Sequence, residues 1–301
     1  MTTITPPKKL AFFYGWPSTV NGAGSVAGAV AIYKEYDQLV FGTGLEDPAH
    51  PDHANMVAII AHPDMANTDV FGYIDATLSV NDVQGKIDQW AVTGIKGIFF
   101  DQFGYDFGVG RQKQREIVWC VQNKNNGLKT FVNAWNVDDV FSPAVDATHN
   151  PAGLPTRLGP NDLYLAESFA IVNGAYDDAD ADSNGIKDFQ DKADKMKTYK
   201  NTFGTSMTAV TTNDASAFDQ AKADYSYLLS VINEFDSWGW GEEFFSSSSS
   251  SLPFRTRATY DGTKFTGALV KNTTTGVIER DTNIGIKIDT VGHVVSNLLD
   301  C

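Results

Sequence analysis

Short runs of apolar residues recur along most of the chain, and polar stretches separate them. Several runs are apolar at every position, as in strands buried on both faces of a parallel sheet. Most follow one another at intervals of about 30 residues, the length of a strand-helix unit. Eight runs predict strands: Leu10–Trp16, Gln38–Phe41, Val70–Asp75, Gly97–Asp101, Thr130–Trp135, Leu163–Glu167, Met207–Thr211 and Ser237–Trp240.

The stretches between these runs carry apolar residues at helical spacing. The helical sets are Val83, Ile87, Trp90 and Ala91, then Ile117, Cys120 and Val121, then Phe218, Ala221, Tyr225, Leu228, Leu229 and Ile232. We expect Trp90 and Trp119 to lie in the core. Alternating strands and helices predict an α/β fold, a (β/α)8 TIM-type barrel over residues 1–245. No comparable helical pattern follows Trp240.

The pattern changes after six consecutive serines, Ser246–Ser251. Residues 246–253 have the composition of a flexible linker. Beyond them, Phe254–Tyr260 and Lys264–Val270 flank Asp261–Gly262, a strong hairpin signal, and the runs Gly276–Arg280 and Ile284–Ile288 follow. Residues 254–301 are predicted to form a small β module. Because so short a segment has a marginal core, we expect it to pack on the barrel or on another protein chain.

Composition excludes several classes of protein. The chain is 42% hydrophobic and 20% charged, as in ordinary globular proteins, and its net charge is −14. This charge argues against nucleic-acid binding and against anionic membranes. No apolar stretch is long enough to span a membrane, and no signal-peptide-like segment precedes the first strand. The two cysteines, Cys120 and Cys301, indicate neither a disulfide framework nor a zinc site.

Acidic residues close three of the predicted strands: Asp75, Asp101 and Glu167. In a barrel, the C-terminal ends of all strands lie on one face, where catalytic residues are found. Two carboxyl groups on such a face can hydrolyse a glycosidic bond, one as acid and the other as nucleophile or base. Their other interpretation is that they cap turns and form ion pairs.

Aromatic residues also lie near the predicted strand ends, where they could stack on sugar rings. This set comprises Tyr14, Trp16, Tyr73, Trp135, Trp238 and Trp240. Ordinary packing around the barrel mouth would use the same residue types.

A 12-residue segment, Asp180–Asp191, matches the D-x-[DN]-x-[DN]-G pattern of calcium loops. Calcium prefers six to eight oxygen ligands, and Gly185 stands where these loops turn sharply. The expected ligands are Asp180, Asp182, Asn184, the carbonyl of Ile186, Asp188 and Asp191. An acidic, solvated loop at a helix start is the alternative.

Four short motifs together resemble a known family. Tyr73–Ile74–Asp75, Gly97–Asp101, Val132–Asn133 and Glu167 occur in the order seen in spherulin-like glycoside hydrolases, a group similar to endo-galactosaminidase barrels acting on amino-sugar polysaccharides. The resemblance covers residues 10–245. It implies a TIM-type barrel with an acidic cleft, with Asp101 and Glu167 on the catalytic positions and Asp75 beside them.

One residue departs from that family. Gln102 replaces the Glu that usually follows the strand-end Asp, and an amide does not exchange protons at working pH. Two functions therefore stay open: a hydrolase of amino-sugar polysaccharides that uses Asp101 and Glu167, with Gln102 and Asn133 contacting substrate, or a carbohydrate-binding or structural protein that does not cut. Calcium, polysaccharide and a serine linker suggest work outside a cell, and the missing signal-type segment suggests a virus particle or tail.

Overall fold

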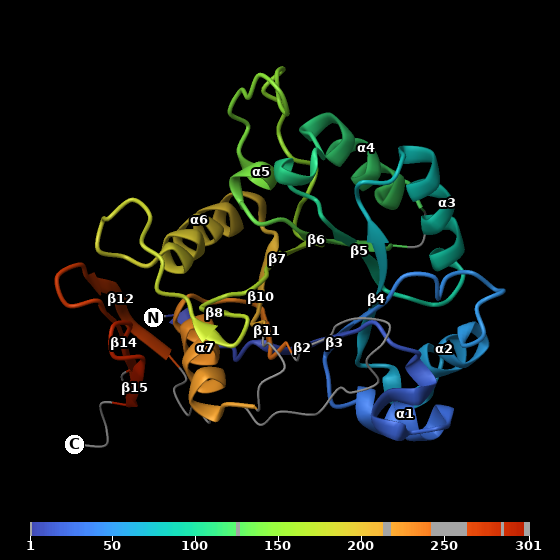
Figure 1. The fold of residues 1–301 in the computed structure, drawn as a ribbon, viewed down its shortest axis with the longest axis horizontal. Coiled ribbons are helices and arrows are strands. Elements are labelled where there is room, and N and C mark those ends of the chain that lie inside the picture. Colours follow the sequence, from blue (N-terminus) through green and yellow to red (C-terminus); the bar gives the residue numbers. More distant parts are fainter. Residues whose placement is uncertain (1, 125–126, 213–217, 242–263, 284–285, 298–301) are drawn as a thin grey trace.

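A computed structural model of the protein describes residues 2–124, 127–212, 218–241, 264–283 and 286–297. Its centre is a closed barrel of eight parallel strands in the order β10-β11-β2-β3-β4-β5-β6-β7 (Figure 1). The predicted TIM-type barrel is confirmed, and each of the eight predicted runs overlaps one barrel strand. The strands are β2 (Lys8–Phe13), β3 (Gln38–Phe41), β4 (Asp69–Asp75), β5 (Gly97–Asp101), β6 (Lys129–Asn133), β7 (Leu163–Ala166), β10 (Ser206–Val210) and β11 (Ser237–Gly239).

Alternate residues of the strands point into the barrel and fill it with apolar side chains. The ring of Phe99 lies 5.3 Å from that of Phe12 and 5.0 Å from that of Phe131. Leu10, Val40, Phe71, Leu163, Leu165 and Val210 complete this inner core. Because the interior is packed, the place to look for a functional site is above it, at the C-terminal ends of the strands.

Helices cover the outside of the barrel (Figure 1). They are α1 (Val26–Tyr33), α2 (His53–Ile60), α3 (Val80–Ala91), α4 (Arg111–Gln122), α5 (Asp138–Phe141), α6 (Asp188–Phe203) and α7 (Gln220–Ile232), with short 3-10 helices η1 (Pro17–Gly22), η2 (Pro63–Met65) and η3 (Tyr105–Phe107). All three helical patterns in the sequence correspond to helices, α3, α4 and α7. The predicted linker, residues 246–253, and the predicted strand 254–260 lie outside the described residues.

The two tryptophans expected in the core differ. Trp90 on α3 is fully buried, and its indole Nε1 donates to the carbonyl of Tyr73 at 3.2 Å. Its ring covers Gly72 on β4, where a Cβ atom would lie 2.3 Å away. Trp119 on α4 is 49% exposed, so the prediction was wrong there. Its neighbours Val118 and Cys120 take the buried face of the helix instead.

This contrast predicts unequal losses of stability. Trp90→Ala should lower the free energy of unfolding by about 3–5 kcal/mol, because it leaves a large cavity beside Gly72. Trp119→Ala, the same substitution on the neighbouring helix, should cost about 1 kcal/mol or less. Urea unfolding followed by circular dichroism measures both, and equal losses would contradict the packing described.

A second sheet lies beside the barrel. Its strands are β1 (Thr2–Thr3), β12 (Lys264–Asn272), β13 (Val277–Thr282), β14 (Ile286–Asp289) and β15 (Val294–Asn297), antiparallel and adjacent in that order. The C-terminal β module is thus present in residues 264–283 and 286–297. Thr2 and Thr3 belong to its sheet rather than to the barrel, contrary to the expected boundaries.

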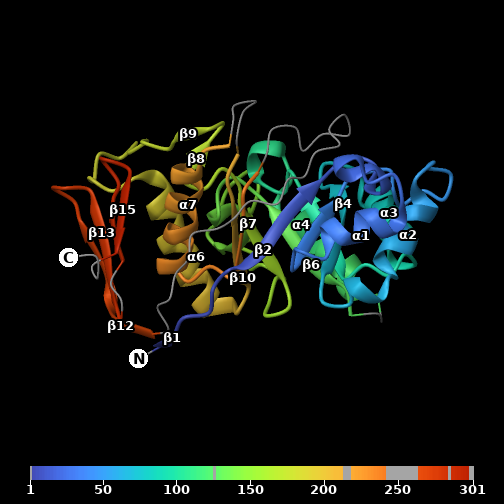
Figure 2. The ribbon, with the colours of Figure 1, turned by 90° about the horizontal axis from the view of Figure 1, so that it is seen from below.

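The C-terminal sheet, as we call these five strands, packs on α6 and α7 (Figure 2). Arg280 Nη1 donates to the carbonyl of Ile232 at 2.6 Å, and Nη2 lies 2.8 Å from Glu234 Oε1. Lys271 forms an ion pair with Asp194 on α6. The expectation that this module packs on the barrel is therefore confirmed. No helix in the described ranges has the length and apolarity to cross a bilayer.

Candidate functional site

Asp101 and Glu167 meet at the C-terminal end of the barrel, where a single amide joins them. Asn133 Nδ2 donates to Asp101 Oδ1 at 2.9 Å and to Glu167 Oε2 at 2.6 Å. The hydroxyl of Tyr73 donates to the other Asp101 oxygen at 3.0 Å. Four adjacent strands, β4 to β7, thus supply or immediately precede these side chains. Tyr73, Asp101, Asn133 and Glu167 form what we call the carboxylate cluster.

Strand alternation directs the carboxylate cluster inward. Phe99 lies in the inner core, so Asp101, two residues later, points to the same side of β5, above it. Phe71 and Tyr73 stand in the same relation on β4. The residues just after the two acids, Gln102 and Ser168, have φ angles of 55° and 56°. Residues other than glycine rarely adopt such angles, and backbone of this kind concentrates at functional sites.

Burial gives Glu167 an unusual proton affinity. The pKa of Glu167 is raised, first by burial and further by the charge of Asp101, while the Asn133 hydrogen bond and the Lys192 charge oppose the rise. Burial and the neighbouring Asp101 also raise the pKa of the Tyr73 hydroxyl. The cluster therefore contains one carboxyl group that keeps its proton to higher pH than an ordinary Glu.

A cavity of about 440 Å³ opens beside Glu167, between the barrel and α6. Trp135 and Lys192 line it, with the Lys192 Nζ 4.5 Å from the centre of the Trp135 ring. Burial lowers the pKa of Lys192 to about 8, against the opposing charges of Glu167 and Asp177. An adjoining hollow of about 680 Å³ shares Trp135 and Lys192 and extends to the acidic loop at Asp182.

The predicted aromatic residues have three different positions. Tyr14 and Tyr73 pack edge to face at 5.4 Å over the inner core, and the charges of Asp101 and Glu167 raise the pKa of Tyr14 after burial does. Trp135 is 58% exposed at the cavity. Trp16, 45% exposed in the loop after β2, packs on His50 and does not line the cavity beside Glu167.

The structure corrects the prediction for Trp238 and Trp240. Both are buried in the outer layer, between the barrel and its helices. Trp238 Nε1 donates to Ser226 Oγ on α7 at 3.0 Å, and Trp240 packs edge to face on Phe218. Alternation explains this placement, because the inward positions of β11 are Ser237 and Gly239.

Asp75 lies beside Asp101 in register but makes different contacts. Its Oδ1 accepts from the backbone N–H of Thr77 at 2.7 Å and from the Thr77 hydroxyl at 2.6 Å. These contacts are those of an Asx turn, the capping role weighed for strand-end acids. Asp75 therefore shapes the loop after β4, while its charge contributes to raising the pKa of Tyr73.

The acidic loop, residues 180–191, is closed by its own hydrogen bonds. Asp180 accepts from the N–H groups of Asn184 and Gly185, and the Asn184 Nδ2 reaches Asp182 Oδ2 at 3.1 Å and Asp191 Oδ2 at 3.0 Å. Gly185 has φ +82° and lies against the carbonyl of Thr273, in the turn between β12 and β13. Among the described residues, no three or more His, Cys, Asp or Glu side chains are arranged to hold a metal ion. Calcium binding stays a prediction.

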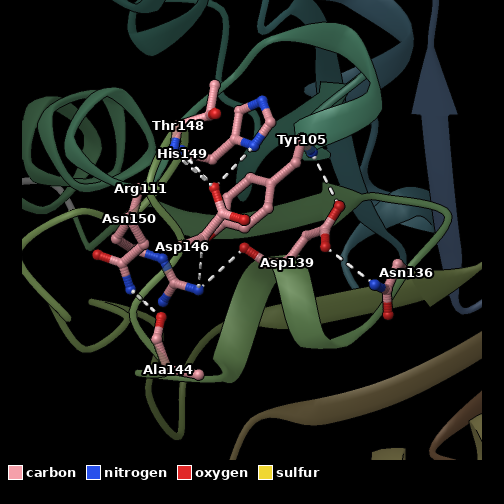
Figure 3. A network of polar contacts seen from close by, with 9 residues as sticks. All are labelled: Tyr105, Arg111, Asn136, Asp139, Ala144, Asp146, Thr148, His149 and Asn150. Atoms are coloured by element: carbon pink, nitrogen blue, oxygen red, sulfur yellow. Dashed lines mark hydrogen bonds and ion pairs between the residues drawn. The ribbon is translucent and has the colours of Figure 1, made fainter.

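A polar network fixes the loops after β5 and β6, which carry the mouth of the site (Figure 3). The Asp139 carboxylate accepts from the Tyr105 N–H and from Asn136 Nδ2, both at 2.9 Å. Buried Arg111 donates through Nη2 to the Asp139 carbonyl at 2.9 Å. The Tyr105 ring stacks on His149 at 4.8 Å. Because Asn136 follows Trp135 directly, this network supports the exposed tryptophan at the cavity.

Sequence reasoning missed Lys192, Tyr176 and Asp177 at the cavity. Lys192 is one of several lysines that alternate with acids along α6, so nothing in the local sequence distinguishes it. Tyr176 and Asp177 lie on or just after a hairpin with two residues in each strand, β8 (Ile171–Val172) and β9 (Ala175–Tyr176), too short for a periodic signal.

Comparison with known proteins identifies no family. No family model matches the chain, and neither does any curated protein. Among solved structures, the chain is similar to dihydrodipicolinate synthase from Agrobacterium tumefaciens (9% identity, 78% of this chain and 70% of that one, TM-score 0.43). It is also similar to pyruvate carboxylase from Rhizobium etli (9%, 80% and 23%, TM-score 0.46) and to Rubisco from Pyrococcus horikoshii (10%, 78% and 53%, TM-score 0.42). With TM-scores below 0.5, these similarities carry no conclusion about function.

Proposed function

We propose that this barrel is a glycoside hydrolase acting on a polysaccharide, with amino-sugar polymers as the substrate class that the family resemblance suggests. The observation that carries the proposal is the Asn133 amide that joins the carboxyl groups of Asp101 and Glu167. Two carboxyl groups in different environments are what acid-assisted glycoside cleavage requires. The open cavity beside Glu167 and its exposed Trp135 supply room and a stacking surface for sugar rings.

The environments of the two acids support separate roles. The raised pKa of Glu167 suits a general acid that protonates the departing oxygen. Asp101 accepts hydrogen bonds from Tyr73 and Asn133, which fix the orientation of its carboxyl group, as a nucleophile requires. In this proposal, Asp101 attacks the anomeric carbon as Glu167 protonates the leaving group, and water, deprotonated by Glu167, then releases the sugar.

The spacing of the two acids supports retention of configuration. The Asp101 and Glu167 oxygens that share the Asn133 nitrogen, at 2.9 and 2.6 Å, are separated by no more than the sum of those distances. Inverting enzymes need roughly 6.5–9.5 Å between carboxyl groups, to make room for water, whereas retaining enzymes need roughly 5–5.5 Å.

Release of reducing sugar from a panel of amino-sugar and neutral bacterial exopolysaccharides tests this function. Wild-type protein and the surface control Glu35→Gln should release sugar equally, while Asp101→Asn and Glu167→Gln should not. Cleavage that persists unchanged in both variants would overturn the assignment.

Carbohydrate binding without cleavage is the second candidate, and Gln102 is the observation that favours it. An amide stands directly after Asp101, in a left-handed backbone conformation, where the resembled family has an acid. The same panel separates the two functions, since glycans that bind wild-type protein in affinity electrophoresis without any release of sugar would favour this candidate.

We also propose that the acidic loop binds calcium, on the basis of its ligand spacing. Binding would require the Asn184 amide to turn its oxygen toward the carboxylates, because its nitrogen now joins Asp182 and Asp191.

Calcium titration should therefore give a saturable binding heat in wild-type protein and none in Asp182→Ala. Chelation of the metal should lower the melting temperature of every variant that keeps the loop intact, and leave that of Asp182→Ala unchanged. Asp82→Ala, a substitution in α3 outside this loop, is the control. No heat in wild-type protein would contradict a calcium site.

A further inference from the structure

One wall of the cavity beside Glu167 is the short hairpin β8–β9. Val172, Ala175, Tyr176 and the following Asp177 line the cavity together with Glu167. The hairpin contains only two residue pairs, Ile171 with Tyr176 and Val172 with Ala175. So small a hairpin is not stable by itself, and its position must depend on what surrounds it.

The hairpin turn is held by the loop after β10. The N–H of Asn173 donates to Thr212 Oγ1 at 3.0 Å, and the N–H of Gly174 donates to the Thr212 carbonyl at 2.9 Å. Lys222 on α7 donates to the carbonyl of Gly174. At the other end, which lines the cavity, the N–H of Asp177 donates to the carbonyl of Ala170 at 3.0 Å, and Lys187 Nζ lies 3.1 Å from Asp178 Oδ1.

The C-terminal sheet also holds that end, and it alone contacts the Tyr176 ring face to face among the described residues. His293, in the turn between β14 and β15, stacks flat on the Tyr176 ring, with the ring centres 3.9 Å apart and the planes 4° from parallel. The His293 Nε2 lies 3.0 Å from Asp178 Oδ1, two residues beyond Tyr176. The edge of Tyr176 packs on Tyr225 of α7 at 5.2 Å. Figure 2 shows β8 and β9 above α7, reaching toward the C-terminal sheet.

Electrostatic interactions link residues 176–178 to the carboxylate cluster. Asp177 lies between the two residues that His293 contacts. Its charge and that of Glu167 both act on Lys192, which lies over Trp135. The charges of Lys192 and Asp101 act in turn on Glu167. A shift of residues 176–178 would therefore move both the wall of the cavity and a charge that faces Lys192.

We propose that His293 is a positioning residue of the substrate site, and that the C-terminal sheet acts through it to hold the β8–β9 wall. The role of this wall in substrate binding rests on the proposed glycosidase function. The clamp itself, by which we mean the stack of His293 on Tyr176 and its hydrogen bond to Asp178, does not rest on that function. The sheet is then part of the proposed site.

Hydrogen exchange measured by mass spectrometry tests the clamp without any substrate. In His293→Ala, exchange of peptides covering residues 171–178 should become about tenfold faster, while exchange in strands β4 to β7 stays as in wild type. His293→Phe, which keeps a flat ring over Tyr176, should restore most of the protection, and His293→Gln should not. Lys287→Ala is the matched control, because Lys287 lies in β14 of the same sheet and forms an ion pair with Glu279 of that sheet.

Kinetics then test the link to the site. With a cleaved polysaccharide, His293→Ala should raise KM about three- to tenfold and leave kcat within about twofold, because it loosens a binding wall and not the reacting groups. Where wild-type protein binds a glycan but does not cut it, affinity electrophoresis should show weaker binding by His293→Ala than by wild type.

The outcomes separate the two proposals. Unchanged exchange at residues 171–178 in His293→Ala, or equal exchange in the Phe and Gln variants, overturns the clamp. Faster exchange there with unchanged KM and affinity overturns its role in substrate binding. If exchange is faster in His293→Ala but the wild-type protein neither binds nor cleaves any glycan, the clamp stands and the glycosidase function is overturned.

Discussion

Glu167→Gln should lower kcat/KM on the natural polysaccharide about 10²- to 10⁴-fold, the range that loss of a general acid costs. The glutamine can still accept the Asn133 hydrogen bond, so the geometry should survive while the transferable proton is lost. An aryl glycoside with an acidic phenol as leaving group needs little protonation. On that substrate, the step that forms the glycosyl-enzyme should slow far less.

The pH dependence of the same variant carries a definite sign. A general acid works only while protonated, so wild-type activity should fall as pH rises through the raised pKa of Glu167. Because burial raises that pKa, activity should persist to higher pH than an ordinary Glu would allow. Glu167→Gln should lose this alkaline limb. A profile of kcat/KM against pH on both substrates measures it, with Glu35→Gln as the control, and an alkaline limb retained in Glu167→Gln would exclude Glu167 as the acid.

The barrel was predictable because its signal is local and repeated. Each strand is a short apolar run, and the run that ends at Asp101 was predicted to the residue. The acids followed from the same logic, since parallel strands bring their C-terminal ends to one face. Alternation then decides which side chains point inward, and the prediction for Trp238 was wrong because this residue points outward from β11, toward Ser226 on α7.

Other features depend on contacts between distant parts of the chain, which no local pattern reveals. The pairing of Thr2 and Thr3 with β12 joins the two ends of the chain in one sheet. Lys192 reaches the cavity from a helix whose sequence resembles an exposed surface, and His293 reaches Tyr176 from a turn more than a hundred residues away. These are the contacts that shape the cavity, so the carboxyl groups were predictable while the walls around them were not.

Asn133 belongs both to the features that local sequence predicts and to the contacts between distant parts of the chain. The sequence marks it only as an amide at a strand end, yet its single nitrogen sets the separation of the acids. It is also buried, and both of its hydrogen bonds run to the two acids. In the proposed mechanism the two carboxyl groups have different roles, nucleophile for Asp101 and acid for Glu167. The stereochemistry of a trapped product can distinguish these roles.

Asp101→Ala should abolish turnover, by more than about 10³-fold, because it removes the group proposed to form the covalent intermediate. It also opens a space below the anomeric carbon. With an activated aryl glycoside, added azide should enter that space, displace the phenol in one step and give a glycosyl azide of inverted configuration. In Glu167→Ala, Asp101 still forms the intermediate, so azide should attack from the opposite face and give the retained configuration.

Nuclear magnetic resonance of the two azide products therefore assigns both roles in one experiment. Asp75→Ala is the matched control, since that acid shares the strand-end position but binds Thr77, and it should turn over without azide. A retained product from Asp101→Ala, with an inverted one from Glu167→Ala, would reverse the roles. Rescue in neither variant, with wild-type protein active, would remove this pair from the chemistry and leave Asp101 and Asn133 as groups that bind the sugar.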